Sequence, residues 1–290
     1  MSQTIHKPVL LEAVLTYLAP EKGESYLDLT AGYGGHATAV LARTNSPEAM
    51  TLVDRDETAI AALAPLGERG ATVVHASFEE ASKALQEQGE SFAMILADLG
   101  VSSLHLDTSS RGFSFAQDGP LDMRMDQESE LTAETIVNSY AQADLERILR
   151  TYGEEPRARR VAAAIVAARP ILSTAGLADV IARTLGRGGK THPATRSFQA
   201  IRIAVNDELG QLERSLPIWL DLLRPGGRLA VISFHSLEDR LVKQAFADVA
   251  GDTYDAGYKL LTKHPVTAGD TEIVFNPRSR SAKLRVLQRK

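Results

Sequence analysis

The chain has 290 residues, of which 44% are hydrophobic and 24% charged, the composition of an ordinary globular protein with room for one large or two modest domains. It contains no cysteine, which excludes disulfides and thiolate metal sites, and its net charge of −5 argues against general affinity for nucleic acid. No signal-peptide pattern and no apolar run of membrane-spanning length is present, so we expect a cytoplasmic protein with no membrane partner.

The first hundred residues alternate between helix and strand patterns. A helix is predicted over residues 8–18, where leucine and valine recur on one face. Short apolar runs at 25–30, 50–53, 71–75 and 92–97 predict strands, and the stretches between them, 37–43, 57–66 and 78–88, predict helices. Such alternation predicts a parallel sheet with right-handed crossovers, and these sheets bind ligands at the carboxyl ends of their strands.

The pattern changes after residue 106. Glycine, serine and aspartate dominate residues 107–126, and helices are predicted at 132–150, 157–168, 175–185 and 194–223, the last interrupted by Pro217. Strand patterns resume at 228–234, and residues 272–275 and 282–288 are expected to pair as strands. We therefore expect a discontinuous core of residues 1–106 and 207–290, with an inserted helical domain of residues 107–206 that recognises the substrate.

A glycine cluster follows the first predicted strand, in the segment Asp28-Leu29-Thr30-Ala31-Gly32-Tyr33-Gly34-Gly35-His36. A strand, a glycine turn and a helix in this order hold nucleotide-like cofactors in doubly wound proteins. About twenty residues later the second strand ends in Asp54, where an acid would bind ribose hydroxyls. The segment therefore predicts a cofactor site at this turn.

The identity of the cofactor depends on Asp28. The spacing Gly32-x-Gly34-x-x-Ala37 also fits the dinucleotide pattern, so a nicotinamide-dependent oxidoreductase remains an alternative. A carboxylate four residues before the first glycine would repel a pyrophosphate, which needs backbone N–H groups instead. It would suit S-adenosylmethionine, which carries a sulfonium and an ammonium, and we therefore favour a methyltransferase.

Several longer strings point to one family. They are His6-Lys7-Pro8-Val9-Leu10-Leu11-Glu12, the segment 28–36, Gly112-Phe113-Ser114-Phe115, Asp118-Gly119-Pro120-Leu121-Asp122-Met123-Arg124-Met125-Asp126, His192-Pro193-Ala194-Thr195-Arg196-Ser197-Phe198-Gln199-Ala200-Ile201-Arg202-Ile203, Ile232-Ser233-Phe234-His235-Ser236-Leu237-Glu238-Asp239-Arg240 and Asn276-Pro277-Arg278. With these strings in this order, the chain resembles the RsmH (MraW) family, whose members methylate the exocyclic N4 of a cytosine in the decoding region of 16S ribosomal RNA.

The resemblance implies a class I, Rossmann-like methyltransferase fold with a helical insertion, S-adenosylmethionine as the methyl donor, and 16S rRNA within the small ribosomal subunit as the partner. It leaves the oligomeric state open between monomer and homodimer. His105 departs from the usual pattern, because a Pro-Gln pair commonly stands where this chain has Leu104-His105. The cofactor contacts implied by motif are Gly34, Gly35, His36, Asp54 on the ribose, Phe78 against the adenine, Asp98 and His105.

Methylation of cytosine N4 needs a hydrogen-bond acceptor, because the N4 lone pair is delocalised into the ring. The Asp/Asn-Pro-Pro-aromatic loop of many exocyclic-amine methyltransferases is absent, since the fourth strand ends Asp98-Leu99-Gly100-Val101. We expect Asp98 or Asp122 to supply the acceptor, with His235 as a second candidate catalytic residue. Phe113 or Phe115 would stack on an extruded base.

Two stretches are basic without any acid, residues 183–202 and 278–290. In the first, Lys190, Arg196 and Arg202 are expected to bind RNA phosphates. No metal site is expected, because no histidines or carboxylates have ligand spacing. The remaining alternatives are a methyltransferase acting on DNA, protein or a small molecule, and a non-catalytic RNA-binding or assembly factor.

Overall fold

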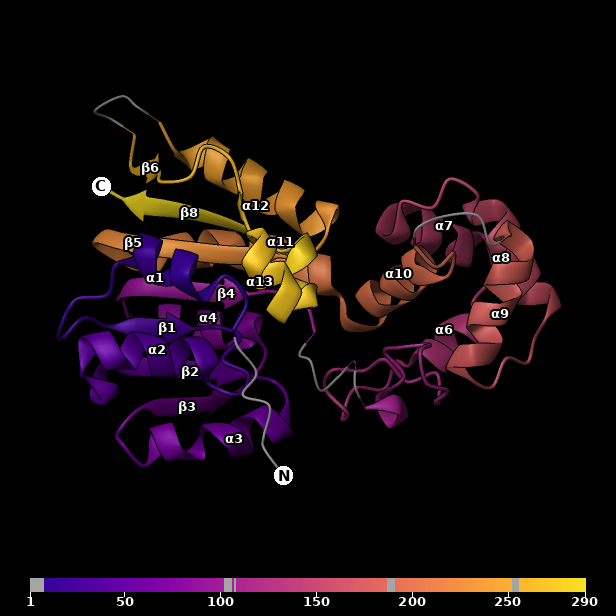
Figure 1. Cartoon of the computed structure of the whole chain (residues 1–290), viewed down its shortest axis with the longest axis horizontal. Helices are drawn as coiled ribbons and strands as arrows, with labels where there is room; N and C mark the ends of the chain where they lie inside the picture. The colour runs from indigo at the N-terminus through magenta and orange to yellow at the C-terminus, as the bar shows by residue number, and fades with distance from the viewer. Residues whose placement is uncertain (1–7, 102–105, 107, 187–190, 252–255) are drawn as a thin grey trace. The chain divides into compact units, whose positions relative to one another are not determined.

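The computed structural model describes residues 8–101, 106, 108–186, 191–251 and 256–290 (Figure 1). The chain forms two compact units, the first made of Met1–Gly100 with Leu209–Lys290 and the second of Val101–Glu208. The insertion expected at residues 107–206 lies inside the second unit. None of the helices within the described residues is long and apolar enough to cross a membrane.

The first unit is a sheet with helices on both faces. The strands are β1 (Tyr26–Asp28), β2 (Met50–Asp54), β3 (Thr72–His75), β4 (Phe92–Asp98), β5 (Leu223–Ser233), β6 (Tyr258–Leu260), β7 (Val266–Thr267) and β8 (Lys283–Arg289). The helices are α1 (Leu11–Leu18), α2 (Gly35–Thr44), α3 (Glu57–Gly67), α4 (Phe78–Glu87), α11 (Glu208–Asp221), α12 (Ser236–Val249) and α13 (Asp270–Phe275), with short 3-10 turns η1 (Pro47–Ala49) and η3 (Pro277–Ser281). The first residue of α11, Glu208, is assigned to the second unit.

The strand order is β3-β2-β1-β4-β5-β8-β6, with β7 also paired to β8. The first five strands are parallel, whereas β8 runs antiparallel to β5. The expected α/β, Rossmann-like sheet is confirmed, and the order reverses between β1 and β4, where such sheets bind ligands.

Alternate strand residues face two separate cores, because successive side chains of a strand point to opposite faces. Met94 and Leu96 of β4 pack with α1, α2 and α3, whereas Ile95 and Ala97 pack with α4, α11 and α12. The near-continuous hydrophobic run in β4 follows from this burial on both faces.

One predicted strand is wrong. Residues 272–275 belong to α13, and the backbone N–H of Asn276 donates to the carbonyl of Glu272. A short apolar run does not by itself distinguish helix from strand. The expected pairing with residues 282–288 is therefore wrong too, because β8 pairs with β5, β6 and β7 instead.

The second unit is helical. It contains a 3-10 turn, η2 (Ser109–Arg111), and the helices α6 (Ala133–Ser139), α7 (Gln142–Gly153), α8 (Ala158–Ala167), α9 (Thr174–Leu185) and α10 (Thr195–Asn206) around one core. Helices α7 and α10 pack closely at Gly153, where a Cβ would lie 2.7 Å from the carbonyl oxygen of Arg196. Glycine is required there by this contact.

Two helix boundaries differ from the prediction. The helix expected over 132–150 breaks at Tyr140, where the Arg169 guanidinium donates to the carbonyls of Val137 and Tyr140 and so ends α6. The helix expected over 194–223 breaks at Asp207, which adopts φ 45°, and Pro217 lies inside α11 without interrupting it. Burial of Leu216 and Trp219 offsets the one hydrogen bond that proline removes.

Candidate functional site

The glycine turn at the carboxyl end of β1 leaves room where a ligand would approach. Gly32 and Gly34 have φ of +52° and +73°, a conformation that other residues rarely adopt. A Cβ on Gly34 would lie 3.0 Å from Leu66, and one on Gly35 would lie 2.5 Å from the ring of Pro8. A Cβ on Gly32 would meet only the carbonyl oxygen of Thr30, at 3.9 Å. The turn is therefore closely packed at Gly34 and Gly35 and has free space beside Gly32.

Two carboxylates organise this turn. Asp54 at the end of β2 accepts from the backbone N–H of Gly32 at 2.8 Å and of Asp56 at 2.9 Å, and burial raises its pKa. Asp28 is 1% exposed and accepts from the Tyr26 hydroxyl at 2.8 Å and the Thr30 N–H at 3.2 Å. Burial raises the pKa of Asp28 from 3.8 to about 6. Asp28 thus acts from beneath the turn, as a buried charge and a hydrogen-bond acceptor.

His36 and Asp98 meet at the same edge of the sheet. The Nε2 of His36, in the first turn of α2, lies 3.7 Å from a carboxylate oxygen of Asp98, at the end of β4. The His36 side chain is 8% exposed, and neither ring nitrogen has a hydrogen-bond partner. The Oδ1 of Asp98 is also buried without one. Buried polar atoms without partners are rare in folded proteins and indicate groups that a ligand completes.

These observations fit S-adenosylmethionine. The open backbone at Gly32, the acid at the end of β2 and the unpartnered atoms of His36 and Asp98 all lie at the carboxyl ends of β1, β2 and β4. A pyrophosphate is disfavoured here, because Asp28, Asp54 and Asp98 are three acids at one edge. A cationic cofactor with a ribose suits the same charges.

The structure describes one of the two remaining predicted cofactor residues, Phe78, but not the other, His105. Phe78 begins α4 and is 9% exposed, with its ring 5.6 Å from that of Trp219 in an edge-to-face contact. This packing leaves little of the ring for an adenine, so the adenine contact stays a prediction that the packing does not support. His105 lies outside the described residues, and its role also stays a prediction.

Asp122 is bound within the second unit. Its two oxygens accept from the Arg124 guanidinium at 3.0 and 2.8 Å, and Oδ1 also accepts from the Arg124 backbone N–H. Partial burial opposes ionisation of Asp122, but the hydrogen bonds from Arg124 outweigh it and lower the pKa. A carboxylate held in this way is a weak proton acceptor, and the geometry favours a structural role for Asp122 in its loop.

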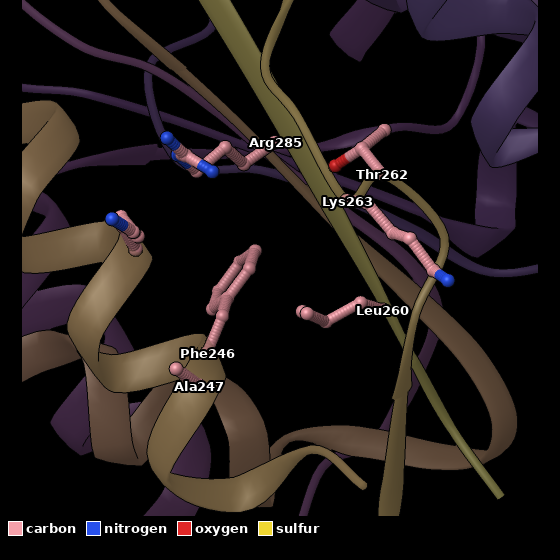
Figure 2. Close-up of a pocket in the computed structure, with 7 residues that line it drawn as sticks. Phe246, Ala247, Leu260, Thr262, Lys263 and Arg285 are labelled. Carbon is pink, nitrogen blue, oxygen red and sulfur yellow. The ribbon is translucent and has the colours of Figure 1, made fainter. Parts of the chain in front are cut away.

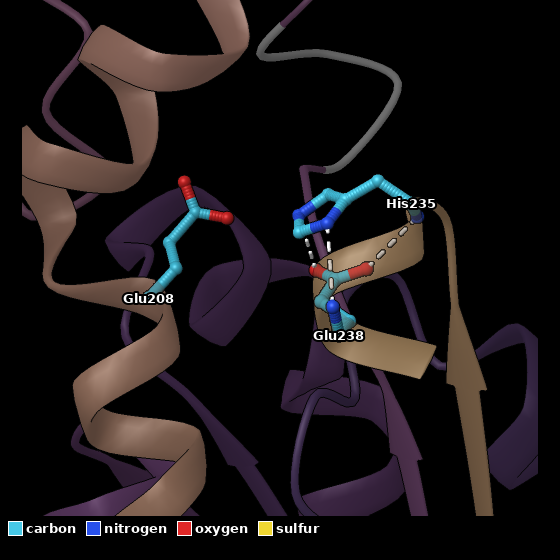
Figure 3. Close-up of side chains that lie close together, drawn as sticks. All are labelled: Glu208, His235 and Glu238. Atoms are coloured by element: carbon cyan, nitrogen blue, oxygen red, sulfur yellow. Dashed lines mark hydrogen bonds and ion pairs between the residues drawn. The ribbon is translucent and has the colours of Figure 1, made fainter. Parts of the chain in front are cut away.

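His235 begins α12 as its N-cap (Figure 3). Its Nδ1 accepts from the backbone N–H of Glu238 at 3.4 Å, its Nε2 lies 3.3 Å from a Glu238 carboxylate oxygen, and that carboxylate accepts from the His235 N–H. The pair forms a capping box, which satisfies N–H groups at the start of the helix. Glu208, which Figure 3 also draws, belongs to the second unit, where it binds Arg202.

The three expected phosphate-binding residues differ in their surroundings. Arg202 donates twice to Glu208, both at 2.8 Å, in a pair whose side chains are 16% and 6% exposed. Arg196 is exposed and donates only to the carbonyl of Glu154 among the bonds described for it, at 3.2 Å. Lys190 lies outside the described residues. Arg196 therefore keeps the accessibility that a phosphate contact needs, whereas Arg202 is committed to an ion pair.

The aromatic candidates lie in the second unit. Phe113 is 6% exposed. Phe115 is half-buried, and its ring lies 4.6 Å from that of His192 and 4.7 Å from that of Phe198. Of the two, Phe115 keeps more surface for a base.

The family follows from sequence comparison. The model of the MraW methylase family matches residues 3–290. The chain belongs to the MraW methylase family. This confirms the resemblance drawn from the motifs.

Relatives match over the whole chain. The ribosomal RNA small subunit methyltransferase H of Heliobacterium mobile is 44% identical, over 98% of each chain. The protein of the same name from Geobacter sulfurreducens is 47% identical, also over 98% of each. A solved rRNA methylase from Streptococcus thermophilus is 12% identical over 99% of each chain, with a TM-score of 0.44.

The glycine turn of this MraW family member has supporting residues that the sequence analysis did not single out. The Thr30 hydroxyl accepts from the backbone N–H of Asp98 at 2.6 Å, which ties β1 to β4 beside the site. The Tyr26 hydroxyl binds Asp28. Thr30 stands two positions and Tyr26 six positions before Gly32, but only the pairing of β1 with β4 brings Thr30 to Asp98.

A separate cavity lies under α12 (Figure 2). None of the predicted cofactor residues lines it. Arg285, one of its cationic residues, already donates to Asp239 at 2.7 Å. The lining residues are Lys243, Phe246, Ala247, Leu260, Thr262, Lys263 and Arg285.

Proposed function

We propose that this protein transfers a methyl group from S-adenosylmethionine to the exocyclic N4 of a cytosine in the decoding region of 16S rRNA, in the small ribosomal subunit and in the cytoplasm. The observation that carries the proposal is the pair of His36 and Asp98 at the glycine turn, in which both imidazole nitrogens and the Asp98 Oδ1 are buried without a hydrogen-bond partner. The chain that holds this pair matches a methylase family over residues 3–290. The substrate class rests on the names of the two relatives, and the target atom rests on the family resemblance of the motifs.

Bound S-adenosylmethionine would supply its sulfonium methyl group. The residues that would hold the cofactor are the backbone of Gly34 and Gly35, Asp54 at the ribose, and His36 with Asp98 at the open edge. Asp28 stabilises positive charge above the turn from its buried position. Phe78 and His105 complete the set implied by the family.

Asp98 is the proton acceptor that we propose. Its side chain is 24% exposed, and its Oδ1 has no hydrogen-bond partner, unlike the carboxylate of Asp122. A carboxylate that accepts from the N4 hydrogens would localise the lone pair on N4 and take the proton as the new C–N bond forms. The reaction then needs chiefly the alignment of N4 with the methyl group and the sulfur.

The second unit is proposed to recognise the RNA. Arg196 on α10 offers an exposed guanidinium for a phosphate, and Phe115 offers a half-buried ring for a base. The phosphate contact of Lys190, which lies outside the described residues, stays a prediction from the sequence. An active monomer and an active homodimer are both compatible with these residues.

The test is methyl transfer from labelled S-adenosylmethionine to small ribosomal subunits from a strain that lacks this enzyme. Digested nucleosides are then separated and weighed by mass spectrometry. We expect labelled N4-methylcytidine, and we expect Asp98→Asn to lower kcat by about 100-fold or more, the usual contribution of general base catalysis. Label on another nucleoside overturns the target atom. Absence of label with the cofactor still bound by calorimetry overturns the substrate, and absence of binding overturns the cofactor.

A further inference from the structure

Two large apolar side chains are exposed side by side on the first unit. Val274 is 74% and Phe275 82% exposed at the end of α13. Among the described residues, the other exposed large hydrophobic side chains are Leu172, which is 75% exposed, and Tyr33, which is 45% exposed. An isolated exposed apolar residue needs no explanation, but an adjacent valine and phenylalanine on a six-residue helix contribute nothing to its packing.

The topology places α13 at the cofactor edge of the sheet. Strand β8 is antiparallel to β5, and Lys283 at its start pairs with Ser233 at the carboxyl end of β5. The segment that leads into β8, which is α13 followed by η3, therefore ends at the carboxyl edge of the parallel strands. It also begins there, because Thr267 at the end of β7 pairs with the same Lys283. Asp28, Asp54 and Asp98 end their strands at this same edge.

A chain of contacts ties α13 to the glycine turn. The Glu272 carboxylate accepts from the backbone N–H of Leu10 at 2.7 Å, so α13 is bound to the segment that precedes α1. In that segment the ring of Pro8 packs against Gly35, where it leaves no room for a Cβ. Helix α13 is thus tied, through residues 8–10, to the segment that packs against the cofactor turn.

The charges that follow α13 are positive. Residues 276–290 contain six lysines or arginines and no acid. Lys283 and Arg285 pair with Asp239, and the Arg289 guanidinium donates to the carbonyls of Asp221 and Leu223, so these three are committed internally. Arg280 on η3 is exposed, and no hydrogen bond or ion pair in the described part of the chain engages it.

We propose that Phe275 and Arg280 form a contact for single-stranded RNA, in which Phe275 stacks on a base next to the target cytosine and Arg280 binds a nearby phosphate. An exposed ring and an unengaged arginine on consecutive elements, here α13 and η3, are the combination with which proteins bind single strands without reading sequence. Its place at the cofactor edge would hold the nucleotide that flanks the reacting one. The proposal rests on the RNA substrate of the proposed function and adds a second, core-borne contact to those of the helical unit.

The test is steady-state methylation of small ribosomal subunits by the full-length enzyme, with three variants of Phe275. Phe275→Ala and Phe275→Leu both remove the ring, while Phe275→Trp keeps a stacking surface. Replacing an aromatic residue that stacks on a base with alanine weakens nucleic-acid binding by about fivefold or more. We expect KM for the subunit to rise at least about fivefold in the first two variants, with kcat and cofactor affinity within about twofold of wild type, and Phe275→Trp to stay close to wild type. Val274→Ala, at the neighbouring position that is 74% exposed, is the matched control and should not change KM, because valine has no ring to stack on a base.

A second arm tests the charge. Arg280→Gln should reduce the slope of log affinity against log salt by about 0.7, the contribution of one phosphate contact on a single strand. Phe275→Leu behaving like wild type would overturn the proposal in favour of an apolar protein partner, and a shift in oligomeric state by light scattering would assign the patch to a second copy. Unchanged KM in all Phe275 variants, with the wild type fully active, overturns this contact alone. An inactive wild type overturns the proposed function itself.

Discussion

At the scale of single residues, burial and pairing separate the groups that are free to do chemistry from those that hold the fold. Sequence motifs name Asp28, Asp98, Asp122 and Arg202 as candidate functional residues. The structure leaves Asp98 with an unpartnered oxygen and commits Asp122 and Arg202 to ion pairs. The partner of each residue depends on packing, which one sequence does not reveal.

Asp28 predicts a pH-dependent stability. Its pKa is about 6 in the folded chain, against an ordinary value of 3.8. Protonation of Asp28 therefore stabilises the folded state, and this stabilisation is fully present below pH 3.8 and is lost as the pH rises through 6. At about 1.4 kcal/mol per pKa unit, the loss is about 3 kcal/mol by pH 7. We expect Asp28→Asn, which keeps acceptors for Thr30, to match wild type in urea unfolding near pH 4 and to exceed it by about 3 kcal/mol at pH 7.

The exposed acid Glu90 provides the control, since Glu90→Gln should leave the free energy of unfolding unchanged both near pH 4 and at pH 7. A constant difference between Asp28→Asn and wild type across this pH range would contradict the burial of an ionised Asp28. Glu79 does not interfere, because the Arg214 hydrogen bonds lower its pKa to about 2 and place its loss of stability at more acidic pH.

Arg202 predicts a loss of stability where the sequence predicts a loss of RNA affinity. Arg202→Ala leaves Glu208, 6% exposed, without its guanidinium, and removing one partner of a buried pair costs about 3 kcal/mol or more. The exposed pair of Arg183 with Asp179 is the matched control, and Arg183→Ala should cost about 1 kcal/mol or less. Urea unfolding measures both. Full stability of Arg202→Ala combined with weaker RNA binding would return Arg202 to the phosphate-binding set.

At the scale of elements, strong periodicity and turn chemistry predict well, and contacts distant in sequence do not. The first four strands along the chain, β1 to β4, and the helices between them follow from local pattern alone. The break at Tyr140 depends on Arg169, twenty-nine residues later, and the survival of α11 across Pro217 depends on burial of Trp219. Residues 272–275 are a helix because Gly269 and Asn276 supply its terminal bonds, which an apolar run does not encode.

His235 predicts an effect on its helix and not on the reaction. Loss of an N-cap costs about 1 kcal/mol, and asparagine is a good substitute at this position. We therefore expect His235→Ala to lower the free energy of unfolding by about that amount and His235→Asn to retain both stability and kcat. Thermal unfolding and methyl transfer are measured on the same samples. A His235→Asn enzyme that is stable but inactive would show that the imidazole itself is needed in catalysis.

At the scale of the whole molecule, the proposed cofactor residues within the described part of the chain belong to one unit, which the chain builds from both of its ends. The glycine turn precedes the helical unit in sequence, and β5 and β8 follow it, with β8 bringing α13 to the cofactor edge. Motifs at 28–36 and 276–278 look unrelated in the sequence and share one edge of the sheet because β8 is antiparallel. That relation needs the register of β8, which no local pattern supplies.

This division predicts how cofactor binding distributes through the chain. A ligand that binds only the folded first unit, at a free concentration of 100 times its Kd, stabilises that unit by about 2.7 kcal/mol. The equilibrium constant for opening of the unit then falls about 100-fold. With S-adenosylmethionine we expect slower hydrogen–deuterium exchange at residues 31–36 and at the ends of β2 and β4. The amides in the cores of α7 and α8 should exchange at unchanged rates, because the cofactor residues described all belong to the first unit. Protection confined to the second unit would mean that the glycine turn is not the cofactor site, and protection of both would mean that the cofactor couples them.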